Sequence, residues 1–308
     1  MSAYAEALET DRKLLWGLCY RMTGNAADAD DLVQETFVRA IEKPPDRTAE
    51  PLRPWLVRVA INLSRDLLRR RKRQGYVGPW LPSPVPTDEQ SPASYEPPAR
   101  NEDSPAARYD LMESVSFAFL LALEALSPTQ RAVLLLRDVF DYSTSETAEA
   151  LDMTEANVKV VLLRARRKMK GYDKDPSRLS PERQQATRRA LEQFLLYLSA
   201  RDAAGLERLL AEDVISLSDG GGEVSAARQP VRGRDKVLRL ILGLAAKLLG
   251  EPRFTVRSLN GFPAILVEDA HSITTAATRY TIHFEVDERG KIHGLHAVLA
   301  PSKLSAIK

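Results

Sequence analysis

The sequence contains a single cysteine, Cys19, in 308 residues. One thiol excludes an intramolecular disulfide and leaves no partners for a cysteine-based zinc site, so a reducing, cytoplasmic environment is expected. The N-terminus also lacks the basic-then-apolar pattern of a secretory signal. The apolar run at 237–250 is shorter than the roughly 18 residues of a membrane span and contains Arg239 and Lys247, so no membrane partner is expected.

Catalytic signatures are absent from the first 170 residues. They contain no glycine-rich phosphate loop, no HExxH motif and no G-x-S-x-G motif. Further along, the candidate polar groups for an enzyme are Asp219, His283, His293 and His296. Strand alternation puts His293 and His296 on opposite faces, so their spacing alone gives no acid–base pair or metal site. We therefore predict no catalytic residue, no metal and no cofactor.

Charge is present in unusual blocks, although the net charge is only +2. Residues 51–75 carry eight arginines and lysines against one acid, Asp66, and residues 79–110 carry six acids against two arginines. The stretch "RARRKMK" at 164–170 is basic again. Two separate basic patches suggest one polyanion that is held at two places, although two solvated helix ends would give the same pattern.

Hydrophobic periodicity and proline content divide the chain. Helical spacing predicts helices over 3–42 with a break at 23–25, over 54–73, and from 109 to 171. In the first of these, Ala29, Leu32, Val33, Phe37, Ala40 and Ile41 form the apolar face. Residues 79–105 hold eight of the nineteen prolines, which is typical of a linker.

The last third has a different pattern. Helical spacing over 182–211 is followed by a strand-like "DVISLS", the turn "DGGG" at 219–222, a helix at 234–249 and four alternating strands. "DERG" at 287–290 predicts a hairpin turn between the last two strands. Helices followed by an antiparallel sheet indicate an α+β domain.

Residues 142–170 resemble a helix-turn-helix. Ala148, Leu151, Val158 and Leu162 are placed to pack two helices together, and an ordinary helical hairpin is the alternative. The second helix would present Glu155, Ala156, Asn157, Lys159 and Val160 to a DNA major groove. Arg164, Arg166, Arg167 and Lys168 would neutralise phosphates without reading sequence.

Three segments in order, "DADDLVQETFVRA", "PWLVRVAINLSRDLLRRRKR" and "LSPTQRAVLLLRDVFDYSTSETAEAL", resemble a bacterial sigma factor of the extracytoplasmic-function (ECF) class. The resemblance covers roughly 5–75 and 108–170. It implies two helical domains on a flexible linker, which bind core RNA polymerase and direct it to the −10 and −35 elements of promoter DNA.

The resemblance also implies roles for residues. Asp28, Asp31, Gln34 and Glu35 would contact core polymerase. Asn62, with Arg58, Arg65, Asp66, Arg69 and Arg70, would meet the −10 element, where one flipped base is expected, and Arg71 to Arg73 would hold phosphate. For the −35 element the residues are Glu155, Ala156, Asn157, Lys159, Val160, Arg164 and Arg166. Val160 and Val161 stand where the family pattern often has small polar and basic residues.

About 137 residues follow the last of these segments, and they resemble a SnoaL-like, cone-shaped α+β domain. Sigma-J-like factors with such a fused domain carry the signatures WLPEP, DGGGK and NPDKL. Here the matching segments are "WLPSP" (80–84), "DGGGE" (219–223) and "APSKL" (300–304). The domain is expected to regulate the sigma domains in cis without catalysis, to make a separate anti-sigma factor unnecessary, and to have a small-molecule ligand as a candidate partner.

The signatures predict where the linker binds. Trp80 and Leu81 would be apolar anchors that dock near Asp219, Gly220, Gly221, Gly222 and Glu223, with Lys303 and Leu304 in the same contact. Trp80 packed back on the first domain is the alternative. Because Ser83 and Glu223 cannot form the Glu–Lys contact that the family signatures suggest, the docking would rest on apolar and backbone contacts.

The predicted protein is therefore multidomain, with two all-α sigma domains and a C-terminal α+β SnoaL-like domain. The boundaries are 1–75 (polymerase and −10 binding), 76–108 (linker), 109–172 (helix-turn-helix, −35 binding), 173–181 (short linker) and 182–308 (regulatory domain). Two alternatives stay open: a ligand-responsive helix-turn-helix regulator that acts without polymerase, and a SnoaL-type enzyme with a DNA-binding appendage.

Overall fold

The computed structural model describes residues 3–43, 52–87, 108–174, 180–247, 252–268, 277–287 and 289–307. It divides the chain into two compact units. The first combines 1–75 with 87–175, and the second combines 76–86 with 176–308. The linker expected at 76–108 is thus divided, since its first part belongs to the second unit, and most of the remainder lies outside the described residues.

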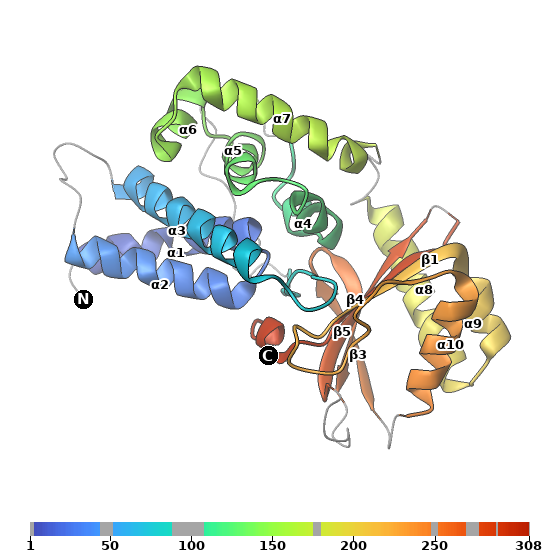
Figure 1. Cartoon of the computed structure of the whole chain (residues 1–308). Coiled ribbons are helices and arrows are strands. Elements are labelled where there is room, and N and C mark those ends of the chain that lie inside the picture. The colour runs from blue at the N-terminus through green and yellow to red at the C-terminus, as the bar shows by residue number, and fades with distance from the viewer. Residues whose placement is uncertain are drawn as a thin grey trace. The chain divides into compact units, whose positions relative to one another are not determined.

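The first unit begins with three helices, α1 (Ala3–Thr23), α2 (Ala26–Glu42) and α3 (Leu52–Gln74) (Figure 1). The predicted break is confirmed, because Gly24 has a positive φ of 63° and the Asn25 side chain caps α2. The inward face of α2 includes Val33, Phe37 and Ala40. The prediction for Ile41 was wrong: it is 66% exposed, since one residue beyond Ala40 turns the side chain about 100° away from that face.

The same unit continues with the 3₁₀ helix η2 (Glu113–Val115) and the helices α4 (Phe117–Leu123), α5 (Pro128–Asp138), α6 (Thr144–Leu151) and α7 (Glu155–Asp173). The predicted helix start at "SPTQ" is confirmed by a capping box between Ser127 and Gln130, with Pro128 in the first turn. A helix was expected from residue 109, but regular α-helix begins only at Phe117, after the N-cap at Ser116.

The second unit packs α8 (Pro181–Ser199), α9 (Ala203–Leu209) and α10 (Arg234–Ala245) on a six-stranded sheet. Its strands are β1 (Leu210–Asp219), β2 (Val231–Arg232), β3 (Arg253–Leu259), β4 (Phe262–Glu268), β5 (Arg279–Val286) and β6 (Ile292–Val298), in the order β2-β1-β6-β5-β4-β3. The expectation of an antiparallel sheet was wrong for one pair, since β1 and β6 are parallel. After β1 and β2 the chain runs through α10 to β3 at the opposite edge of the sheet. The antiparallel strands β3 to β6 then lead back across the sheet, and β6 arrives beside β1 in the parallel direction.

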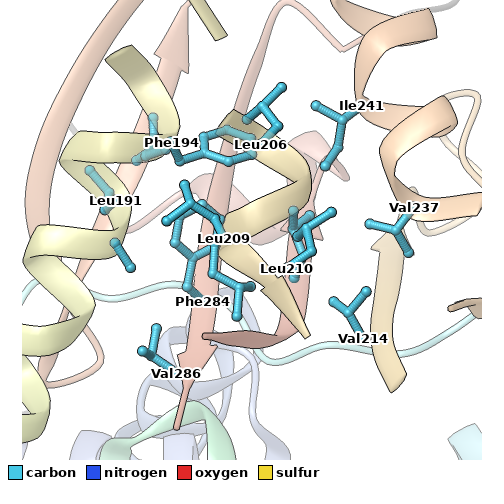
Figure 2. Packing of buried hydrophobic residues seen from close by; sticks show 14 of the residues in the cluster. Leu191, Phe194, Leu206, Leu209, Leu210, Val214, Val237, Ile241, Phe284 and Val286 are labelled. Carbon is cyan, nitrogen blue, oxygen red and sulfur yellow. The ribbon is translucent and has the colours of Figure 1, made fainter. Parts of the chain in front are cut away.

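Helices cover one face of this sheet and form its hydrophobic core (Figure 2). Leu191 and Phe194 of α8 and Val237 and Ile241 of α10 belong to the cluster, and Phe194 meets Phe284 of β5 edge to face at 5.1 Å. This core therefore holds α8, α9 and α10 on one face of the sheet. Across the described part of the chain, every helix is too short or too polar to cross a bilayer.

Candidate functional sites

The outer face of α2 carries the residues predicted for polymerase binding. Asp31, Gln34 and Glu35 are exposed. Asp28 is partly covered, because its carboxylate pairs with Arg71, which also donates to the Thr23 carbonyl at 3.1 Å. The structure therefore uses Asp28 and Arg71 to fasten α3 to the start of α2. Val38, which helical spacing predicts on this outer side, and Ile41, which was expected on the inner face, continue the same face and are 39% and 66% exposed.

The basic helix α3 carries the residues predicted for the −10 element. Asn62, Asp66, Arg69 and Arg70 are exposed, and Arg58 is partly exposed. Arg65 is not free for DNA here: it donates to Asn62 Oδ1 and to Thr129 Oγ1 of α5, both at 3.3 Å. Burial, with the nearby charge of Arg69, lowers the pKa of the Arg65 guanidinium.

Helices α6 and α7 form the predicted helix-turn-helix. Ala148, Leu151, Val158 and Leu162 are buried between the helices, as expected. The turn uses Asp152 in a left-handed conformation (φ 51°), and Thr154 caps α7 by accepting from the Asn157 backbone N–H. The chain reverses here without glycine because aspartate tolerates this region.

The exposed face of α7 contains Glu155, Ala156, Asn157, Lys159 and Val160, together with Arg164 and Arg167. Val160 is 46% exposed and Val161 is half-buried, so only the first presents much apolar surface to solvent. Leu163, which sequence reasoning missed, is 53% exposed on the same helix.

Arg166, predicted as a DNA contact, has a structural partner instead. Its guanidinium donates twice to the carboxylate of Asp138, at 2.9 and 2.6 Å, and that carboxylate is almost fully buried. These hydrogen bonds raise the pKa of Arg166. A bidentate pair of this kind fixes the orientation of both groups, so Arg166 ties α7 to α5.

Two buried arginines join the first three helices to the helices that follow. Arg21 is fully buried and donates to Ser114 Oγ at 2.6 Å and to the Leu111 carbonyl at 2.9 Å. Arg131 is 3% exposed and donates to the Met22 carbonyl at 2.7 Å. Burial lowers the pKa of Arg21 to about 10. We call this contact the arginine join; sequence reasoning missed it because both residues lie far from their partners along the chain.

The linker strip, Tyr76–Pro86, is held at two points in the second unit. At the first, the Asp219 carboxylate at the end of β1 accepts from the Tyr76 hydroxyl at 2.6 Å and from the Leu81 backbone N–H at 2.7 Å. Lys303 completes the group, since its ammonium lies 2.6 Å from Asp219 Oδ2 and donates to the Leu81 carbonyl at 2.5 Å. We call Tyr76, Trp80, Leu81, Asp219 and Lys303 the Asp219 clasp.

Apolar contact reinforces this first point. Leu81 is fully buried, whereas Trp80 is only partly buried and lies with its ring 4.6 Å from the Lys303 ammonium. The Tyr76 ring faces the same ammonium at 4.8 Å. Cation–π contacts of this kind are strongest when the cation is removed from water, and the Lys303 side chain is 3% exposed.

The second point lies at the turn between β3 and β4. The Val85 N–H donates to Asn260 Oδ1 at 3.0 Å, and the Asn260 N–H donates to the Val85 carbonyl at 2.9 Å. Asn260 and Gly261 both have positive φ, as a tight Asn-Gly hairpin turn requires. In strand order β6 and β5 lie between the two points, so the strip spans much of the sheet.

The glycine segment after Asp219 shapes the first point. A side chain at Gly220 would come within 2.6 Å of the Val224 carbonyl. Gly221 has a φ of 60°, and a side chain there would come within 3.1 Å of Ala300 and 3.4 Å of the Tyr76 hydroxyl. Gly222 faces Val77 of the strip. Glu223 accepts from the Ser302 hydroxyl at 2.5 Å, which fastens this turn to the 3₁₀ helix η3 (Pro301–Leu304).

The strip itself docks through apolar and backbone groups, as expected: Leu81 is fully buried, and the backbone groups of Leu81 and Val85 form hydrogen bonds with the domain. The domain adds a buried charge pair that the sequence did not predict. Asp219 and Lys303 form an ion pair whose side chains are 0% and 3% exposed, and both also bind the strip. This pair joins two of the signature segments, 219–223 and 300–304. Leu304, 6% exposed, is buried beside Lys303 in η3.

The three candidate histidines lie in two separate places in the second unit. His293 bridges Asp213 and Asp287, both at 3.0 Å, near the protein surface. His283 and His296 are paired across β5 and β6 and are each 5% exposed. Burial, with a smaller effect from His296, lowers the pKa of His283 to about 3. Within the described residues, histidine, cysteine and carboxylate side chains form no cluster of three suited to a metal ion.

Comparisons with known proteins identify the two helical regions of the first unit and find a relative whose crystal structure matches nearly the whole chain. Models of sigma-70 region 2 and sigma-70 region 4 match residues 8–74 and 116–169. The ECF RNA polymerase sigma factor SigJ of Mycobacterium tuberculosis is 34% identical over 78% of this chain and 72% of that protein. The probable ECF RNA polymerase sigma factor SigI of the same species is 26% identical over 98% of this chain and 95% of its own. The crystal structure of SigJ covers 97% of both chains with a TM-score of 0.71 and 27% identity.

Proposed function

Because the chain belongs to the ECF RNA polymerase sigma factors, it acts with core RNA polymerase in promoter-directed transcription initiation, and we propose that its C-terminal domain controls this activity by holding the linker strip. The family matches do not favour a DNA-binding regulator that works without polymerase, nor an enzyme with a DNA-binding appendage. The observation that carries the proposal is the Asp219 carboxylate, which binds the Leu81 N–H and the Tyr76 hydroxyl of the strip.

The polymerase-binding surface is the outer face of α2. Asp31, Gln34 and Glu35 supply polar contacts, and Val38 and Ile41 supply an exposed apolar area beside them. Interfaces commonly combine an apolar centre with a polar rim. Asp28 contributes indirectly in this account, since its pairing with Arg71 sets the angle between α2 and α3.

Promoter DNA is held at two places by α3 and α7. Asn62, Asp66, Arg69 and Arg70 face solvent on α3 and serve the −10 element, with Arg58 beside them. On α7 the exposed residues Glu155 to Asn157, Lys159 and Val160 serve the −35 element, while Arg164 and Arg167 bind phosphate. Arg65 can contact the −10 element only after its hydrogen bond to Thr129 of α5 breaks.

Binding at both elements requires the arginine join to open. The elements are named for positions about 25 base pairs apart, which is about 85 Å of duplex at roughly 3.4 Å per base pair. Two small helical domains that share hydrogen bonds through Arg21 and Arg131 cannot span this distance. The linker must therefore extend, and the strip shortens the free linker while it is docked on the C-terminal domain.

Control within one chain makes a separate anti-sigma protein unnecessary in this proposal. The domain acts by binding rather than by catalysis, since its buried polar centre, Asp219 with Lys303, is committed to the strip. The nearby histidines are either surface ion partners or a buried strand pair. Release of the strip is therefore the regulated step.

A pull-down with core RNA polymerase, followed by run-off transcription, tests the proposal. The full chain is compared with Glu35→Lys and with a chain ending at Lys174. We expect the full chain to associate with polymerase, Glu35→Lys to associate at least fivefold less, and the shortened chain to initiate more transcripts than the full chain. Failure of both the full and the shortened chains to associate with polymerase would overturn the assignment.

A further inference from the structure

A large cavity lies on the helix-covered side of the C-terminal sheet and has no part in the clasp. Its volume is about 630 Å³, within the range of small-molecule sites. Most of its lining is apolar and comes from α8, α10 and the strands, including Phe194, Ile241, Leu244, Ile282 and Ala297. Figure 2 shows Phe194 and Ile241 in the cluster that forms part of this wall.

One end of the cavity carries hydroxyl groups. Ser216 is 2% exposed, lines the cavity, and forms no side-chain hydrogen bond within the described part of the chain. A hydroxyl group that lines a cavity and has no protein partner is available both to donate to and to accept from a bound molecule. Ser218, two residues along the same strand, and Ser225 at the rim line the same end.

This hydroxyl end adjoins the linker strip through one strand. Ser216 pairs with Leu295 of the helix-covered core, so Ser216 and Ser218 point to that side, whereas Asp219 points to the other. Ser218 and Ser225 also line a second, smaller cavity of about 140 Å³, which Val77 and Gly78 of the strip border. A molecule that bridged Ser218 and Ser225 would tie the 220–228 segment to β1 directly beneath the strip.

We propose that the large cavity binds a small, mostly apolar molecule with one hydrogen-bonding oxygen at the serine end, and that its occupancy holds the linker strip more firmly. The apolar walls take the body of the molecule, and Ser216 and Ser218 bind its oxygen. The first half of this proposal is independent of the sigma-factor mechanism. The second half rests on the proposed role of the strip, because binding at the serines favours the docked state of Val77 and Gly78.

Calorimetric titration of the full chain with 2-naphthol and with naphthalene tests the first half. The two probes share an apolar ring system and differ by one hydroxyl. We expect 2-naphthol to bind roughly three- to tenfold more tightly, as one additional neutral hydrogen bond provides. Ser216→Ala should remove most of that preference and leave the naphthalene affinity unchanged. Equal affinities in the unaltered chain, or a preference that survives Ser216→Ala, would overturn the oxygen site.

A cavity-filling variant separates this site from adsorption to the surface. Ala297→Phe should weaken both probes at least tenfold, while Ala204→Phe, the same change at an exposed position of α9, should have no effect. An unchanged thermal midpoint of Ala297→Phe shows that the unit is folded. Undiminished binding by the folded variant would contradict the site.

Hydrogen exchange of the Leu81 amide tests the second half, since this N–H donates to Asp219 only while the strip is docked. Saturating 2-naphthol should slow the exchange at least threefold in the unaltered chain and leave it unchanged in Ala297→Phe. Tight probe binding without slower exchange would refute the link to the strip and leave the proposed sigma-factor function standing.

Discussion

The arginine join and the Asp219 clasp both bury a positive charge, but they neutralise it differently. Lys303 in the clasp has a carboxylate partner, Asp219, at 2.6 Å. Arg21 in the join is held by a serine hydroxyl and backbone carbonyls, and burial lowers its pKa to about 10. Removing Asp219 from the clasp therefore leaves a buried charge unpaired. Removing Arg21 from the join leaves only neutral acceptors, and removing Arg131 leaves neutral carbonyls and the carboxylate of Glu124, which is 43% exposed to water. A substitution in the clasp should therefore lower the stability of its unit more than a substitution in the join.

The largest effect is expected for Asp219→Ala. This change leaves the Lys303 ammonium buried without its counter-charge, and it should lower the free energy of unfolding of the second unit by about 3–5 kcal/mol. Denaturant titration monitored by hydrogen exchange of residues 76–86 measures it. Asp213→Ala is the matched control on the same strand, because Asp213 is 79% exposed, and it should change stability by less than about 0.5 kcal/mol. Similar losses in both variants would show that the clasp is not the centre of docking.

A smaller effect is expected for Arg131→Met in the join. The Met22 and Leu123 carbonyls and the Glu124 carboxylate would lose a donor, at about 1–3 kcal/mol in the stability of the first unit. Transcription should rise, since the join opens more readily. Arg12→Met, at an exposed arginine of α1, should alter neither stability nor transcript yield. A fall in transcription by folded Arg131→Met would contradict the requirement for opening.

Acid should weaken the second unit through His283. Its pKa in the folded unit is about 3, against 6.5 for an ordinary histidine, so below pH 6.5 the unfolded chain takes up a proton that the folded unit does not. This contribution to stability is intact above pH 6.5 and declines by about 1.4 kcal/mol for each pH unit as the pH falls toward 3. Denaturation of the unaltered chain and of His283→Gln at pH 7.5 and 5.5 measures it. Equal pH dependence in the two chains would refute the assignment.

The smallest effect is expected at α7. Arg167→Ala should reduce the slope of log affinity against log salt by about 0.9 for one lost phosphate contact, as measured on promoter DNA with the polymerase complex. Arg166→Ala should keep the slope and lower the thermal midpoint instead, since Arg166 pairs with the buried Asp138. A reduced slope for Arg166→Ala would return that residue to the DNA-binding set.

Local pattern was enough to predict most helices and strands. The α2 stripe, the capping box at Ser127 and the alternation in β3 to β6 all depend on residues within a few positions of each other. The parallel pairing of β1 with β6 was missed because it joins residues about 80 positions apart. The short β2 and η3 have too few residues for a period to show.

The functional residues divide in the same way. Exposed positions on α2, α3 and α7 follow from helical spacing, whereas ion pairs between distant segments do not. Three predicted contact residues have structural partners: Asp28 and Arg71 pair with each other, and Arg166 pairs with Asp138. Trp80 and Leu81 were both expected to be apolar anchors; Leu81 is fully buried, whereas Trp80 is only partly buried. The hydrogen bond of Tyr76 and the ion pair of Lys303 were not predicted, because they join residues from three segments that are far apart in the sequence.

Run-off transcription by core polymerase with Leu81→Asp tests the central claim most directly. This change places a carboxylate in the fully buried Leu81 position beside Asp219, so it expels the strip while the C-terminal domain keeps its own residues. The control is Leu196→Asp, the same change at a 62% exposed position of α8. The account predicts at least twofold more transcript from Leu81→Asp than from the unaltered chain, and no change from Leu196→Asp. Equal transcript from all three proteins, with faster exchange of residues 76–86 in Leu81→Asp, would contradict it.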